Sequence, residues 1–83
     1  MNEEVLEEEL FDIEIQLSTN YITLHNVDKN IYSALLDAYD ENYQHIFTIL
    51  CSEDDKEYES HMFKPCDIQR ISVIKQKSKR LLG

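Results

Sequence analysis

The stretch from Val27 to Asn42 constrains the fold most, because it has the clearest helical period in the chain. Asp28 is suited to the N-cap position, since its carboxylate can accept hydrogen bonds from the first free backbone N–H groups. Asn42 can end the helix in a left-handed conformation. The apolar residues recur every three to five positions, which places them on one face: Ile31, Tyr32, Leu35, Leu36 and Tyr39. An amphipathic helix over 28–42 must bury that face against other elements.

Two strands are predicted before the helix. Residues 11–17 alternate between apolar and polar side chains, which is typical of a half-buried strand with an acidic face toward water. Residues 18–20 form a short polar turn, so a strand over 21–26 is expected to pair antiparallel with the first. Residues 1–10 carry five glutamates that repel one another, and we expect a frayed helix or a mobile arm there.

A hairpin is predicted after the helix. Residues 43–51 are apolar on both faces, which favours a central strand. Residues 52–57 form a charged loop tip, and residues 58–63 alternate weakly and return as the partner strand.

The end of the domain contains a proline turn. Pro65 breaks the preceding strand because it lacks a backbone donor. The spacing of Ile68 and Ile71 suits a tight 3₁₀ turn, and a last short strand follows over 71–74. This sequence of strand, proline turn, isoleucine-rich turn and strand over 43–74 resembles the last third of SH3-like and Sm-like small barrels. The resemblance is one of geometry, and a plain layer of sheet and helix has the greater weight.

The predicted fold class is therefore α+β, a single small domain with four or five short, mostly antiparallel strands and one packed helix. Residues 1–10 are assigned to an acidic N-terminal arm, 11–75 to the domain and 76–83 to a basic C-terminal tail. In general style the chain resembles the small acidic accessory proteins of bacteriophages, which are short, poor in glycine and free of motifs.

Charge is the strongest compositional feature, with a formal net charge of −9. Residues 1–69 hold all 17 acidic residues and three lysines, whereas residues 70–83 hold five basic residues and no acidic one. Such asymmetry concerns partners and association rates rather than the fold. The acidic beginning of the sequence and the lack of an apolar run of about 20 residues predict neither a signal peptide nor a membrane span, so the cytoplasm is the expected compartment.

Side chains able to carry chemistry are few. Four residues could bind a soft metal, but they lack the close spacing of ligand pairs, so we expect no metal site: His45, Cys51, His61 and Cys66. Cys66, after the proline turn, is the better candidate nucleophile, but its acidic surroundings disfavour a thiolate. A calcium loop at 52–57 lacks the required glycine and ligand spacing. The sequence predicts no enzyme and no cofactor.

The favoured hypothesis is a non-enzymatic acidic module that binds a basic surface on another protein. It extends to an inhibitor that acts as a nucleic-acid mimic in a phage accessory or anti-defence role, by occupying a partner's nucleic-acid-binding groove. The expected contact residues are acids and tyrosines near the helix end and the loop: Asp37, Asp40, Glu41, Tyr39, Tyr43, Glu53, Asp54 and Asp55.

Two alternatives remain. An acidic surface can simply maintain solubility. A chain this short also gains burial by association, so a homo-oligomeric structural protein, or one that sequesters a nucleotide at a subunit boundary, is the second functional hypothesis. Direct nucleic-acid binding is expected only through the basic tail, and membrane binding is not expected.

Overall fold

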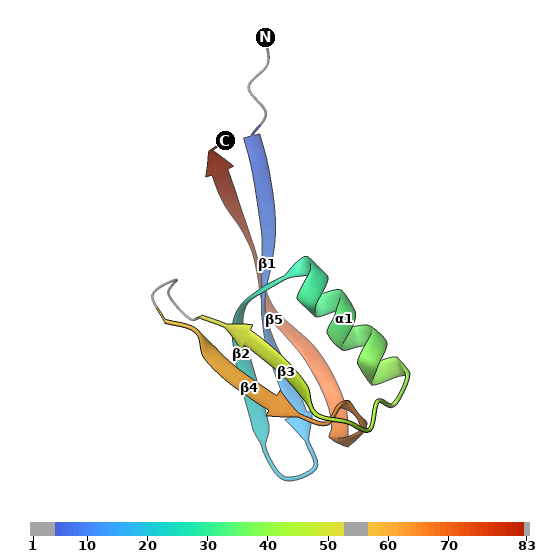
Figure 1. Ribbon diagram of the computed structural model, residues 1–83. Helices are drawn as coiled ribbons and strands as arrows, with labels where there is room; N and C mark the ends of the chain where they lie inside the picture. Colours follow the sequence, from blue (N-terminus) through green and yellow to red (C-terminus); the bar gives the residue numbers. More distant parts are fainter. Residues whose placement is uncertain (1–4, 53–56, 83) are drawn as a thin grey trace.

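The computed structural model describes residues 5–52 and 57–82, which form one α+β domain (Figure 1). The elements in chain order are β1 (Val5–Leu17), β2 (Tyr21–Asp28), α1 (Lys29–Asp40), β3 (Phe47–Cys51), β4 (Glu59–Phe63), the 3₁₀ helix η1 (Pro65–Asp67) and β5 (Ile68–Leu82). The strands make two antiparallel sheets, one of order β2-β1-β5 and one of β3 and β4. The predicted fold class is confirmed.

Strand β1 is the centre of the larger sheet. Its alternation buries Phe11, Ile13 and Ile15 in the core, as the sequence predicts. The predicted antiparallel pairing of β1 and β2 is also confirmed, and the turn between them is closed by the Leu17 N–H, which donates to the Asn20 carbonyl at 2.8 Å.

A bulge in β2 and a bulge in β5 each place two apolar residues that are three positions apart on the same side of the strand, whereas a regular strand needs an even spacing. Leu24 and Val27 are both fully buried because the register of β2 shifts between them, at Asn26, whose φ is 56°. Ile68 and Ile71 lie opposite Leu17 and Ile15, with a similar shift between them. The 3₁₀ turn predicted at the two isoleucines is therefore wrong. The turn occurs earlier, where proline suits the first helical position.

The helix matches its prediction closely. The Asp28 carboxylate accepts from the Ile31 N–H at 2.8 Å, as an N-cap residue does. Asn42 has a φ of 54°, which confirms the left-handed end. Leu35 is fully buried, and the Tyr32 ring stacks on Phe11 with 4.8 Å between centroids, so α1 is fastened to β1.

The hairpin of β3 and β4 forms as predicted, but β3 is not central. It pairs with β4 in the two-stranded sheet. Ile49 and Cys51 face the core, whereas Leu50 is 58% exposed. Apolar side chains on both faces of β3 therefore do not mean burial on both faces. The outer face of the hairpin comprises Ile46, Thr48, Leu50, Tyr58, Ser60 and Met62.

The first and last strands lie side by side. Strand β1 begins at Val5 and pairs with β5 as far as Leu82, so residues 5–10 and 76–82, which the sequence assigned to a separate arm and tail, belong to paired strands (Figure 1). The helix considered for the N-terminal arm does not form over residues 5–10. The register places the glutamates at 7 and 8 opposite Arg80 and Lys79.

Candidate protein-docking site

A groove between α1 and β3 brings together three of the predicted contact residues. It encloses about 390 Å³. The helix, the loop after it and the start of β3 supply its lining: Ala34, Asp37, Ala38, Glu41, Tyr43, Ile46, Phe47 and Thr48. The groove thus combines small and apolar side chains with carboxylates along one side.

The helix sets the positions of the carboxylates. Ala34, Asp37, Ala38 and Glu41 are three or four residues apart, which places them on one stripe of α1. Short alanine side chains leave room between the helix and β3, and the acids border that room. Spacing on the helix therefore produces a groove with an apolar floor and an acidic edge.

The loop after the helix holds Tyr43 in place through its backbone. The Tyr43 N–H donates to the Ala38 carbonyl at 3.0 Å, and its carbonyl accepts from the Cys66 N–H at 2.9 Å. The His45 ring packs edge-on against the Tyr43 ring, with 5.5 Å between centroids. Tyr43 is 40% exposed, so a fixed aromatic ring borders the groove.

The electrostatics of this end of the helix favour a cation. Asp37, Asp40 and Glu41 are all exposed. Within residues 5–52 and 57–82, none of these three carboxylates forms an ion pair. The C-terminus of α1 adds the partial negative charge of its free carbonyl groups. A positive charge from outside would relieve this repulsion.

The other predicted contact residues lie elsewhere. Tyr39 packs against the core, so it does not line the groove. The most exposed tyrosines are Tyr21 and Tyr58, which the sequence analysis did not select. Glu53, Asp54 and Asp55 lie outside the described residues.

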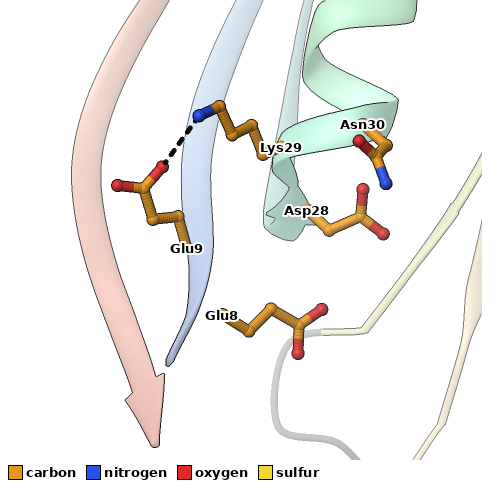
Figure 2. A pocket seen from close by; sticks show the side chains of 5 residues that line it. All are labelled: Glu8, Glu9, Asp28, Lys29 and Asn30. Carbon is orange, nitrogen blue, oxygen red and sulfur yellow. Dashed lines mark ion pairs between the residues drawn. The ribbon is translucent and has the colours of Figure 1, made fainter. Parts of the chain in front are cut away.

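A second hollow lies between β1 and the start of α1 and encloses about 460 Å³ (Figure 2). Glu8, Glu9, Asp28, Lys29 and Asn30 line it. This hollow is larger than the groove, but part of its negative charge is already balanced by contacts within the protein. The Lys29 ammonium lies 3.8 Å from the Glu9 carboxylate, and the Asp28 carboxylate caps the helix. It is therefore a weaker candidate for binding a cation.

A third hollow, of about 210 Å³, lies where β3 approaches the start of α1. It shares Glu8 and Asp28 with the second hollow, and its other lining residues are mainly apolar or uncharged: Leu10, Asn26, Ile31, Leu50, Cys51, Ser52 and Tyr58. Like the groove, it is bordered by both α1 and β3. We call the groove and this third hollow together the α1–β3 seam.

A polar cluster around Asp12 was missed by the sequence analysis, which placed this carboxylate on a water-facing strand surface. Its side chain is only 13% exposed. It accepts from the Asn26 N–H at 3.0 Å and lies 3.1 Å from the Lys77 ammonium, which also donates to the Asn26 side-chain oxygen at 2.7 Å. His25 lies 3.7 Å away. No local signal indicates this cluster, because its members come from three strands.

The cluster lowers the pKa of Asp12. Burial alone raises the pKa of this carboxyl, but the bond from Asn26 and the bond and charge of Lys77 outweigh burial, with a smaller contribution from His25. The charged form is thus the stable one. Both strands next to β1 bulge beside Asp12. We call this part of the sheet the junction, and we expect the cluster to stabilise it because its members join all three strands.

Burial and nearby acids determine the surroundings of Cys51 and His61. Cys51 is buried, and burial raises the pKa of its thiol, as do the charges of Glu59 and Asp12, against a bond from the His25 backbone. His61 lies 3.7 Å from Glu59. In the described part of the chain, no three His, Cys, Asp or Glu side chains come together as metal ligands. No helix among these residues is long and apolar enough to cross a membrane.

Comparisons of the chain with protein-family models, curated proteins and solved structures found no match.

Proposed function

We propose that the protein is a non-enzymatic binding module that docks on a basic surface of a partner protein, in the cytoplasm, through the acidic edge of the groove between α1 and β3. The observation that carries the proposal is the pair Asp37 and Glu41. Both are exposed beside an apolar floor and a fixed tyrosine ring, and neither forms an ion pair within the described residues. A basic side chain can place its charge at the carboxylates and its aliphatic stem on the floor.

The proposal extends to inhibition. A net charge of −9 on 83 residues favours surfaces that normally bind nucleic acid, so the module would compete with DNA or RNA for a partner's basic groove. This is the activity of an accessory or anti-defence protein, which acts by occupying a site and not by changing a substrate.

The test uses a hexa-arginine peptide as the probe of a basic surface. Its affinity should fall steeply between about 0.1 M and about 1 M salt, over which the Debye length falls from about 10 Å to about 3 Å. The double variant Asp37→Asn/Glu41→Gln should lose about tenfold in affinity, which is about 1.4 kcal/mol. Equal binding by the wild type and this variant would refute the proposal.

A matched control separates a local effect from a change in net charge. Glu14 alternates with the buried Ile13 and Ile15, so its side chain points away from the core side that α1 covers. Each single change, Asp37→Asn or Glu41→Gln, removes the same charge as Glu14→Gln. Only the two helix variants should weaken peptide binding by more than about twofold, because exposed charges act mainly over short distances at physiological salt.

A homo-oligomer is the second candidate, favoured by the outer face of the hairpin. Leu50 and Met62 on that face are 58% and 65% exposed. Contiguous exposed apolar side chains often mark interaction surfaces. Analytical ultracentrifugation tests this with the wild type and the double variant Leu50→Asn/Met62→Gln over a concentration series. If the wild type forms a dimer and the variant does not, the second candidate is favoured.

A further inference from the structure

The two hollows of the α1–β3 seam follow each other along the same two elements. Ile31 lines one hollow and Ala34 the other, and these residues are about one helical turn apart. On β3, Leu50 lines the first of these hollows and Thr48 the second, and residues two apart on a strand lie on one face. The middle of the seam is therefore bordered by apolar and small side chains from both elements.

Carboxylates stand at both ends of the seam. Asp37 and Glu41 border one end, and Glu8 and Asp28 border the other. The Asp28 carboxylate already accepts from the Ile31 N–H at 2.8 Å. Its capacity to bind a cation is therefore lower than that of the carboxylates at the Asp37 end, so the seam attracts positive charge at both ends but unequally.

From this arrangement we propose that the seam binds an extended segment of the partner in which two arginines, four residues apart, flank an apolar residue at the midpoint. The inference rests on the proposed function and adds the form of the recognised segment. Asp37 is nine positions after Asp28, the N-cap of α1, which corresponds to about 13.5 Å along the helix. Residues four apart in an extended chain lie about 13 Å apart and point to the same side, as does the residue between them.

The chemistry of each position follows from the lining. Arginine suits the ends because its planar guanidinium can bind two carboxylate oxygens at once, and its stem can lie on apolar surface. A leucine at the midpoint would lie near Ile31, Ala34, Thr48 and Leu50, where a charged side chain would lose its water without a partner.

Two capped pentapeptides of the same composition test the spacing. In the spaced peptide the order is arginine, threonine, leucine, threonine, arginine, and in the adjacent peptide the two arginines come first, followed by leucine and the two threonines. Titration of the full chain, monitored by amide chemical shifts, should give the spaced peptide at least a fivefold higher affinity. It should shift amides at both ends of the seam, near Tyr43 and near Glu8, whereas the adjacent peptide should shift mainly those near Tyr43.

Three variants distinguish the ends. Glu41→Gln should weaken both peptides about fivefold, since both use the Asp37 end. Glu8→Gln should weaken only the spaced peptide, about twofold, because only that peptide reaches the other end. Glu14→Gln, which points away from the core side that α1 covers, should weaken neither.

The outcomes separate this inference from the proposed function. Equal affinities for the two peptides, with hexa-arginine still bound in a manner sensitive to Asp37 and Glu41, would overturn the spacing and leave the function intact. Failure of all three peptides to bind would overturn both. The chain could instead form a dimer through the seam that dissociates when the spaced peptide is added. That result would show that a second copy occupies the seam, and it would also overturn the inference.

Discussion

The larger sheet and the hairpin use similar apolar residues to different effect. In β1, Ile13 and Ile15 are fully buried in the core, and polar side chains alternate with them. In β3, Ile49 is buried but its neighbour Leu50 is 58% exposed. Both sheets therefore contribute one face to the same core, whereas the outer face of the hairpin carries exposed apolar side chains. A position that is apolar but uncovered is more informative about binding than one that is apolar and buried.

The sharpest test of this difference compares one truncation in each sheet. Ile13→Ala should lower the free energy of unfolding by about 2–5 kcal/mol, because it removes a fully buried side chain and leaves a cavity. Leu50→Ala should change it by less than about 0.5 kcal/mol, because the side chain is largely exposed. Urea unfolding measures both. Similar losses in the two variants would mean that the hairpin face is covered in solution.

The next largest effect is expected at the Asp12 cluster of the larger sheet. Asp12→Ala should cost about 1–3 kcal/mol of unfolding free energy, because it removes the carboxylate that accepts from the Asn26 N–H and pairs with the Lys77 ammonium. Glu14→Ala on the same strand is the control and should cost much less. A loss at Asp12 no greater than at Glu14 would show that the cluster does not stabilise the junction.

The same cluster predicts a dependence on acid. Because the folded-state pKa of Asp12 lies below its usual value, ionised Asp12 contributes stability that is present above about pH 4 and is lost as the pH falls through the folded-state pKa. The difference in stability between the wild type and Asp12→Asn should therefore shrink from pH 7 to strong acid. A difference that stays constant over that range, measured by urea unfolding, would exclude this linkage.

Smaller effects are expected at the two ends of the helix that covers the larger sheet. Asp28→Ala should cost about 1 kcal/mol, since it removes the bond that caps Ile31. Asp40→Asn should instead gain a few tenths of a kcal/mol, because Asp40 opposes the helix dipole at the C-terminus. Thermal unfolding of both variants tests the signs, and destabilisation by Asp40→Asn would show that its charge has a structural role.

Local patterns account for the parts of the structure that the sequence predicts well. Alternation identifies the buried face of β1, and the Asp28 and Asn42 positions mark the start and end of the helix. No groove was predicted, but two of the predicted contact residues, Asp37 and Glu41, line it, because they lie on the polar stripe of that helix. These features follow from a few consecutive residues, and their period or capping chemistry is visible without knowledge of the rest of the chain.

By itself, the sequence determined the fold class, the helix with its caps and the antiparallel pairing of neighbouring strands, because each depends on interactions close along the chain. Only the tertiary structure decided that one face of β3 is exposed, that the two ends pair as strands and that Asp12 is buried in a charged cluster. These outcomes depend on which distant segment lies opposite, and bulges at Asn26 and beside Ile68 alter which side chains face inward. The local period of a segment does not contain that information, because burial and charge pairing depend on which other segments lie next to it in the folded structure.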